Sequence, residues 1–157
     1  MAKMRDRIRM TDAEVAAFLD EESVLLCATN GKDGWPHLAP LDYLVDAGVP
    51  SAWTYRASQK VRNLERDPRA TISIDAGTAY TELRGVMLTC DVEIRHDDAE
   101  VAVFGRALAA RRLGIAADDL GVGEIERIEA QAVKRVVLRF HERRRASWDH
   151  RKLATAS

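Results

Sequence analysis

The amino-acid sequence predicts an α+β domain built on an antiparallel β-barrel with helices at its flanks. About six short segments have the alternating or β-branched character of strands and are separated by turn residues, which is typical of barrels. The strand-like segments between residues 23 and 55 follow one another too closely for the crossover helices that parallel strands require. The 157 residues are most simply a single domain, long enough to bury a full hydrophobic core.

The amino-terminal segment is expected to place one helix before the first strand. Residues 1–10 are basic and are expected to be flexible. Thr11 and Glu14 then form a capping-box pattern, which predicts a helix ending near Asp20. The apolar segment 23–29 follows and predicts the first strand.

The next segment, residues 35–46, is expected to form one or two strands interrupted by Pro36 and Pro40. Proline lacks the N–H that a sheet ladder needs, so Pro36 and Pro40 predict edges, bulges or irregular backbone that leave polar groups free for a ligand. His37 lies between them and is the one histidine that we place near a ligand. The other histidines lack a metal partner at helical spacing and are interpreted as structural or solvent-facing: His96, His141 and His150.

The segment around Ser58 is predicted to form a corner between a strand and a short helix, and we expect the rest of the chain to be organised around it. Residues 53–55 have strand character, Ser58 is a plausible N-cap, and residues 59–66 form a helix that Pro68 ends. A helix N-terminus with exposed N–H groups, a hydroxyl and Lys60 in its first turn is a suitable site for phosphate. The other interpretation is a surface helix whose charges face water, as most charged helix faces do.

The carboxy-terminal half predicts three more strands and two helices. Gly85 is placed at a bend of the longest strand, and Trp148 is expected to dock either on its own chain or on a partner subunit. The predicted elements are strands at 70–75, 86–94 and 133–141, a helix at 97–113, a loop at 114–123, a short helix at 124–130 and a tail at 143–153.

Composition excludes several classes of function. A net charge of -1 gives no reason to expect nucleic acid or a membrane surface as a partner, and three consecutive arginines at 143–145 are weak evidence for one. The chain has neither a bilayer-spanning apolar run nor a signal-peptide core. Cys27 and Cys90 lie in apolar segments and predict free buried thiols in a reducing cytoplasm, and no spacing indicates a metal site.

Four motifs occur in order along the chain: Thr11–Glu14 with Phe18-Leu19, Asp33–Pro40, Thr54 with Ser58–Arg69, and Ser147–Leu153. Together they resemble the split-barrel flavin and deazaflavin family related to pyridoxamine 5′-phosphate oxidase. The resemblance covers nearly the whole chain and implies a six-stranded antiparallel split barrel, the FMN-binding split barrel. The last motif and the short length are more similar to the actinobacterial branch that uses the deazaflavin coenzyme F420.

The resemblance implies a cytoplasmic homodimer with two cofactor sites at the interface. The activity implied is hydride transfer between F420 and a small conjugated organic acceptor, and no side chain is nominated as catalytic. Trp148 would approach the site from the partner chain. By resemblance, the cofactor phosphate would be held by Thr54, Ser58, Lys60 and Asn63, while backbone around His37, Leu38, Ala39 and Pro40 would run along the ring system and Trp53 and Tyr55 would flank it.

Two departures from the family pattern keep alternatives open. Ser58 and Gln59 stand where many members carry a second basic residue, so Arg56 or Arg62 would have to substitute. A basic carboxy-terminal R-x-H is not convincingly present, which disfavours vitamin B6 oxidation. The alternatives are an FMN-dependent oxidoreductase of the pyridoxamine 5′-phosphate oxidase type and a non-catalytic flavin- or haem-binding split barrel, with His37 or His96 as an axial ligand.

Overall fold

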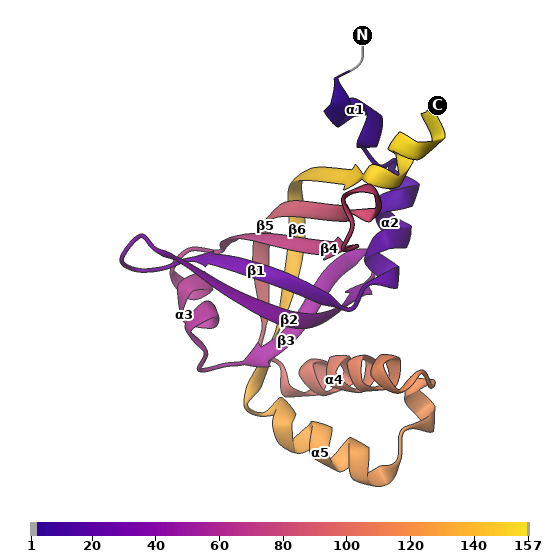
Figure 1. Ribbon diagram of the computed structural model, residues 1–157. Coiled ribbons are helices and arrows are strands. Elements are labelled where there is room, and N and C mark those ends of the chain that lie inside the picture. Colours follow the sequence, from indigo (N-terminus) through magenta and orange to yellow (C-terminus); the bar gives the residue numbers. More distant parts are fainter. Residues whose placement is uncertain (1–2, 157) are drawn as a thin grey trace.

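Six antiparallel strands form one closed barrel in a computed structural model that describes residues 3–156. The strand order around the barrel is β1-β2-β3-β6-β5-β4, and every neighbouring pair is antiparallel (Figure 1). The prediction of an α+β antiparallel barrel with flanking helices is therefore confirmed. The strands are β1 Val24–Asn30, β2 Pro36–Asp46, β3 Val49–Tyr55, β4 Arg69–Ala76, β5 Arg84–Arg95 and β6 Arg135–Asp149.

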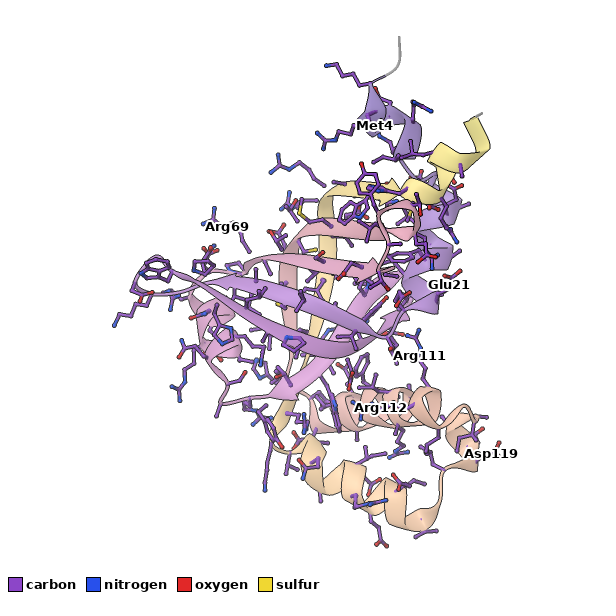
Figure 2. All side chains as sticks on the ribbon, viewed as in Figure 1. Met4, Glu21, Arg69, Arg111, Arg112 and Asp119 are labelled. Carbon is purple, nitrogen blue, oxygen red and sulfur yellow. The ribbon has the colours of Figure 1, made fainter. Side chains whose placement is uncertain are left out.

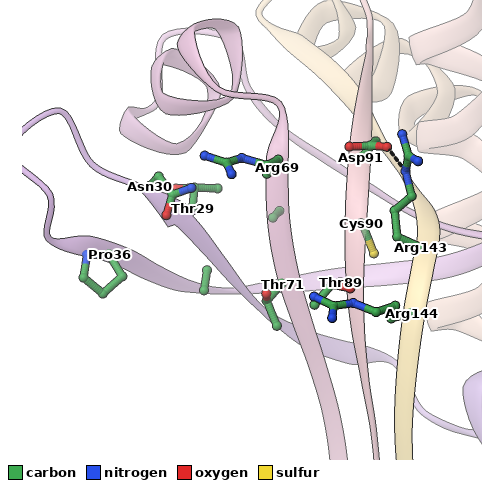
Figure 3. A pocket seen from close by; sticks show the side chains of 12 residues that line it. Thr29, Asn30, Pro36, Arg69, Thr71, Thr89, Cys90, Asp91, Arg143 and Arg144 are labelled. Carbon is green, nitrogen blue, oxygen red and sulfur yellow. Dashed lines mark hydrogen bonds and ion pairs between the residues drawn. The ribbon is translucent and has the colours of Figure 1, made fainter.

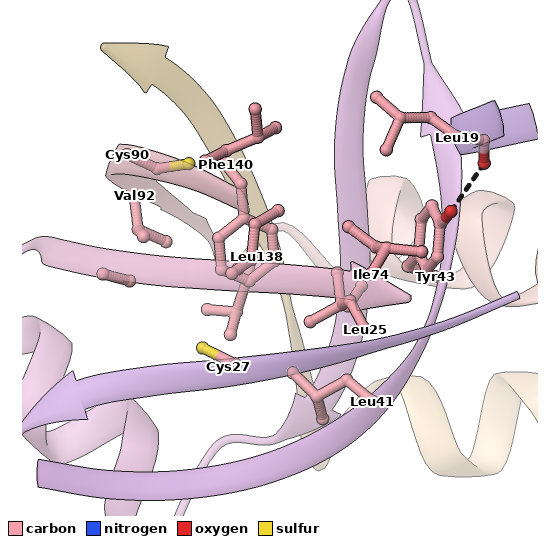
Figure 4. Packing of buried hydrophobic residues seen from close by; sticks show 14 of the residues in the cluster. Leu19, Leu25, Cys27, Leu41, Tyr43, Ile74, Cys90, Val92, Leu138 and Phe140 are labelled. Carbon is pink, nitrogen blue, oxygen red and sulfur yellow. Dashed lines mark hydrogen bonds between the residues drawn. The ribbon is translucent and has the colours of Figure 1, made fainter. Parts of the chain in front are cut away.

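The barrel interior is filled by the inward-facing apolar side chains of all six strands (Figure 4). Tyr43 is fully buried, and its hydroxyl donates a hydrogen bond of 2.6 Å to the carbonyl oxygen of Leu19. Cys27 and Cys90 are free and buried, as predicted. Burial raises the pKa of the Cys27 thiol to about 11, so this thiol remains protonated at neutral pH.

Two helices precede the barrel. The short helix α1 spans Met4–Ile8, within the segment that was expected to be flexible; that flexibility stays a prediction. Helix α2 spans Asp12–Glu21, and both hydrogen bonds of the capping box between Thr11 and Glu14 are present. Its buried residues, among them Phe18, pack into the main core.

Strand β2 is continuous, so the prediction that prolines interrupt this segment was wrong. Pro36 pairs with Asn30 and Pro40 with Leu26 in one unbroken register with β1. The prediction of an edge was right, because β2 pairs with β3 only from Tyr43 onward. Residues 36–42 therefore have a neighbour on one side only, and a missing N–H is tolerated on a free edge. The barrel is split at this edge.

Helix α3 spans Gln59–Arg66 and packs next to the split, against β1 and β2. It ends at the residue before Asp67, as Pro68 predicts. The backbone amide of Asp67 still donates to Asn63, which closes the last turn.

The register of β5 with β6 shifts between Thr89 and Cys90 and is unbroken at Gly85, so the bend at Gly85 stays a prediction. Gly85 accommodates the indole of Trp148 on the neighbouring strand. A Cβ atom at Gly85 would lie 2.1 Å from that ring. Trp148 therefore docks on its own chain in this structure.

A helical hairpin between β5 and β6 covers the side of the barrel formed by β2, β3 and β6 (Figure 1). Helix α4 spans Asp98–Leu113 and is capped by Asp97, while α5 spans Val122–Ala132 and is longer than predicted. Strand β6 runs to Asp149, so most of the predicted tail is strand. Short 3-10 helices occur at Tyr80–Glu82, Ala117–Asp119 and His150–Ala156.

Within residues 3–156, every helix is too short or too polar to cross a lipid bilayer.

Candidate functional site

The split between β2 and β3 places the first turn of α3 against the end of β3. Lys60 reaches back along the strand, and its Nζ donates a hydrogen bond of 3.1 Å to Oγ1 of the buried Thr54. The two residues are six positions apart in sequence and are joined by a tight corner, in which the amide of Ser58 donates to the carbonyl of Tyr55 at 3.1 Å. The structure thus brings together three of the four residues expected at the phosphate.

Lys60 is half-buried, and no carboxylate of the described residues pairs with it. Burial lowers the pKa of its ammonium group below the ordinary value, because a cation loses water there without gaining a counter-ion. An uncompensated, partly desolvated cation favours the binding of an anion.

Ser58 occupies the N-cap position of α3 with extended backbone, yet it makes no side-chain cap hydrogen bond. Its Oγ atom is buried and has no hydrogen-bond partner within the described part of the chain. A buried hydroxyl without a partner is uncommon in folded proteins and calls for an explanation such as an absent ligand. The hydroxyl and the uncapped first turn lie beside Lys60, so the corner fits an anionic group.

Asn63 is fully buried, and its amide is occupied by protein groups. Its Nδ2 donates to Thr29 Oγ1 at 3.0 Å, and its Oδ1 accepts from Gln59 Nε2 at 2.9 Å and from Arg66 at 3.3 Å. The bond to Thr29 holds α3 against β1, while the other two lie within α3. The predicted contact of Asn63 with a cofactor stays a prediction, and its observed part is to position the helix.

A hollow of about 700 Å³ lies between α3 and the turn that joins β1 to β2. His37 contributes to its wall, and its Nδ1 is buried without a partner among the described residues. Trp35 lies on the same wall and is 76% exposed. Sequence reasoning missed it as a site residue, although a tryptophan in a glycine-rich turn was a visible signal. The wall consists of Gly31, Lys32, Asp33, Trp35, Pro36, His37, Gln59 and Asn63.

Three other residues of the predicted site lie outside this hollow. Leu38 and Pro40 are exposed farther along the free edge of β2, with Ala39 between them.

Trp53 and Tyr55 lie on the opposite face of β3 from Thr54. The ring of Trp53 packs closely against Gly105 of α4, where a Cβ atom would lie 2.5 Å from it. The guanidinium of Arg135 lies over both rings, 4.5 Å from the centroid of Trp53 and 4.0 Å from that of Tyr55. The structure does not place Trp53 beside Lys60, and no local pattern in the sequence indicated Arg135.

Trp148 lies at the other end of the barrel from α3 within one chain. Trp148 pairs with Gly85, near the start of β5. Farther along β5, Asp91 pairs with the first residue of β4, which follows shortly after α3. Six strand positions separate Gly85 from Asp91, a distance of about 20 Å at the usual rise of a strand. Trp148 and Lys60 of one chain therefore belong to different sites.

A second groove, of about 470 Å³, crosses the outer face of β1, β4, β5 and β6 (Figure 3). Arg69 and Arg143 on its walls each pair with an aspartate, Asp67 and Asp91 respectively. Arg145 points elsewhere and pairs with Glu142 and Asp12. Arg143 and Arg145 thus have different acidic partners, while Arg144 lines the groove.

Comparison with known proteins places the chain in a family. The sequence profile of the pyridoxamine 5′-phosphate oxidase family matches residues 11–148, so the chain belongs to this family of flavin-binding split-barrel oxidoreductases. None of the curated protein sequences matches the chain.

Solved structures agree with this assignment. A conserved hypothetical protein of Mycobacterium tuberculosis, Rv2991, is 35% identical over 98% of this chain and 93% of its own, with a TM-score of 0.87. A protein named F420 reductase is 20% identical over 83% of this chain and 94% of its own, with a TM-score of 0.64. HutZ, a haem storage protein of Vibrio cholerae, is 15% identical over 88% of this chain and 93% of its own, with a TM-score of 0.65. The last two share the fold.

Proposed function

We propose that this protein is a reductase that transfers a hydride from reduced coenzyme F420 to a small conjugated organic acceptor. The observation that carries the proposal is the half-buried Lys60, without a carboxylate partner among the described residues, beside the unpartnered hydroxyl of Ser58. Lys60 and Ser58 would hold the cofactor phosphate, and Thr54 would keep the lysine in position. An ammonium group that has already lost part of its water binds a phosphate with less further desolvation.

The free edge of β2 supports the second part of the proposed site. Residues 37–40 lack a neighbouring strand on the side of the split, so their backbone groups on that side are available to a ring system. The deazaflavin supplies the hydride when it is bound, and solvent supplies the proton to the acceptor. The protein then binds and orients the two reactants, and no side chain of this chain is assigned a proton-transfer role.

The choice of F420 over FMN rests on sequence resemblance. The segment Ser147–Leu153 and the short length are similar to the F420-using branch, the relative at 35% identity is mycobacterial, and a protein named F420 reductase shares the fold. FMN would occupy the same corner through its phosphate. A haem-binding protein is the non-catalytic alternative, because HutZ shares the fold and His37 has a buried nitrogen without a partner among the described residues.

We further propose that the protein acts as a homodimer through the outer face of β1, β4 and β5. Leu26, Ser73 and Met87 are cross-strand neighbours on this face, and Leu26 and Met87 are 36% and 39% exposed. Val24 continues the apolar face along β1. No helix of the described residues covers the strands there in Figure 1. A second copy on this face would bury these side chains and would bring its own Trp148 toward the corner of Lys60.

Single-turnover kinetics under anaerobic conditions would test the activity. Reduced F420 bound to the protein is mixed with a panel of conjugated acceptors, and the return of the oxidised deazaflavin absorbance is followed. We expect oxidation of the cofactor that depends on both the acceptor and the protein. At a fixed cofactor concentration, Lys60→Met should slow this oxidation, and Arg127→Gln on α5 should not. Tight binding of F420 without oxidation by any acceptor would indicate a carrier and would overturn the reductase.

A further inference from the structure

A row of short side chains forms the floor of the groove on the outer face of the barrel (Figure 3). Ala28 of β1 pairs with Thr71 of β4, which in turn pairs with Thr89 of β5. Arg144 of β6 is the next residue in this row, because it pairs with Thr89. The row borders the face proposed for the dimer, which lies two residues away along each of β1, β4 and β5. The short side chains leave space above the sheet, and Arg144 extends over it from one side.

An extra residue in β6 brings two consecutive arginines to the groove. Arg144 pairs with Thr89, but the next residue of β5, Cys90, pairs with Glu142. Arg143 is therefore the extra residue of a β-bulge, and it lines the groove together with Arg144. Neighbouring residues of a regular strand face opposite sides, so the bulge explains why both arginines reach the same face.

Arg144 is the one arginine of the groove that has no acidic partner among the described residues. Arg69 donates two hydrogen bonds, of 2.9 and 2.8 Å, to the carboxylate of Asp67, and Arg143 pairs with Asp91. Three guanidinium groups thus meet two carboxylates here, which leaves one positive charge. The planar fork of N–H groups of an arginine matches the oxygen atoms of a carboxylate or a phosphate.

Thr89 supplies the second, independent observation. Its Oγ1 atom is buried and has no hydrogen-bond partner within residues 3–156. In that range, Ser58 at the proposed phosphate corner has the only other hydroxyl of this kind. A buried hydroxyl without a partner calls for an explanation such as an absent ligand. Because Thr89 and Arg144 are directly opposite each other on neighbouring strands, one anion would reach both side chains.

We propose that this groove is a second anion site, in which Arg144 and Thr89 bind the carboxylate or phosphate group of a small molecule. The guanidinium of Arg144 and the hydroxyl of Thr89 donate to the same group. The volume of about 470 Å³ leaves room for an organic body attached to the anion. The site does not depend on the proposed function, because Lys60 bonds to the buried Thr54 at the split whereas the groove lies on the outer face.

Nuclear magnetic resonance titration of the ¹⁵N-labelled protein tests this site residue by residue. Inorganic phosphate and glutarate are the two probes, added in separate experiments. We expect the amide resonances of Thr71, Thr89 and Arg144 to shift and to saturate with at least one probe, with a Kd below about 10 mM. The probe that saturates at the lower concentration distinguishes phosphate esters from carboxylic acids. Shifts at Ser58 and Lys60 report the other site separately.

Variants of the two proposed ligands separate a built site from a solvated surface arginine. Arg144→Gln and Thr89→Val should each weaken binding at least about tenfold, because each removes a hydrogen bond to a charged group. Thr89→Ser retains the hydroxyl and should keep most of the affinity. Arg7→Gln is the matched control and should change nothing, because Arg7 is also exposed and without an acidic partner among the described residues but lies on α1.

The stability of Thr89→Val provides a further check that needs no ligand. Valine replaces an unpartnered hydroxyl by a methyl group of the same shape, so its Tm without an anion should equal or exceed that of the wild type. A lower Tm would show that the hydroxyl has a partner within the protein and would overturn the proposal. It would also be overturned by absence of saturation with both probes, or by an affinity that either Arg144→Gln or Thr89→Val leaves within about twofold. Lys60→Met should leave the shifts in the groove unchanged, so failure of one site does not decide the other.

Discussion

Arg111 connects three parts of the chain that are far apart in sequence. Its guanidinium donates to the carbonyl oxygens of Tyr43 at 3.1 Å, Asp20 at 2.5 Å and Glu22 at 2.7 Å. In Figure 2 it lies between α4 and the barrel. One side chain thus fixes the last turns of α4 to β2 and to the carboxy-terminal end of α2. Three carbonyls would lose their donor together if it were removed.

Arg111→Ala is expected to destabilise the protein by about 2 kcal/mol, because hydrogen bonds from a charged donor to partly buried carbonyls are lost. This corresponds to a fall in Tm of about 4–8 °C for a domain of this size. The adjacent Arg112 is a matched control, since it makes an exposed ion pair with Asp42. Arg112→Ala should cost less than about 1 kcal/mol. Equal shifts in Tm for the two variants by thermal denaturation would contradict this account of Arg111.

The residues of the site that sequence could predict are those that meet through local chain geometry. Lys60 and Thr54 lie across one tight corner, so their contact follows from the strand, the turn and the helix that the sequence indicates. The placement of Trp53 depends on Gly105, which is 52 residues later, and that of Arg135 depends on the pairing of β3 with β6. An isolated glycine within a predicted helix was a signal of close packing that could have been used for Trp53.

Elements whose ends carry turn or capping residues were predicted closely. The capping box at Thr11 and the proline after α3 place helix ends within a residue or two of those observed. Strand β6 was predicted too short, because its arginines suggest a solvated tail. In the structure their backbone is paired with β5, and the side chains of Arg143 and Arg145 form ion pairs with Asp91 on β5 and Glu142 on β6.

The prolines of β2 show why tertiary context decides an element. A proline in a central strand removes a ladder hydrogen bond, and the interrupted strand was the reasonable expectation. A segment of a strand is central where both neighbouring strands pair with it, and it is at an edge where one of them does not. Strand β2 pairs with β3 only from Tyr43 onward, so the segment before Tyr43 is at an edge. The separation of β2 from β3 before Tyr43 also opens the split next to α3. The free edge that accommodates Pro36 and Pro40 therefore also exposes the candidate site.

At the scale of the whole molecule, the proposed dimer makes a testable prediction. Met87→Lys places a charge on the outer face of β5 and should convert a dimer at micromolar concentration into a monomer, because an interface core excludes an unpaired charge. Val103→Lys, at an apolar residue of α4 that is 62% exposed, is the matched control and should remain dimeric. Sedimentation velocity measures both. A wild-type monomer, or a dimer that Met87→Lys leaves intact, would contradict this interface.

The central claim is that the corner of Ser58 and Lys60 binds the phosphate of a deazaflavin cofactor. Tryptophan fluorescence titration of the cofactor-free protein with F420 and, separately, with FMN tests it most directly, because Trp35 lines the adjoining hollow. We expect tight quenching by F420, weak quenching by FMN, and an affinity for F420 at least about tenfold lower in Lys60→Met. Tighter binding of FMN would assign the protein to the FMN oxidoreductases. Absence of binding by both, or wild-type affinity in Lys60→Met, would contradict the account.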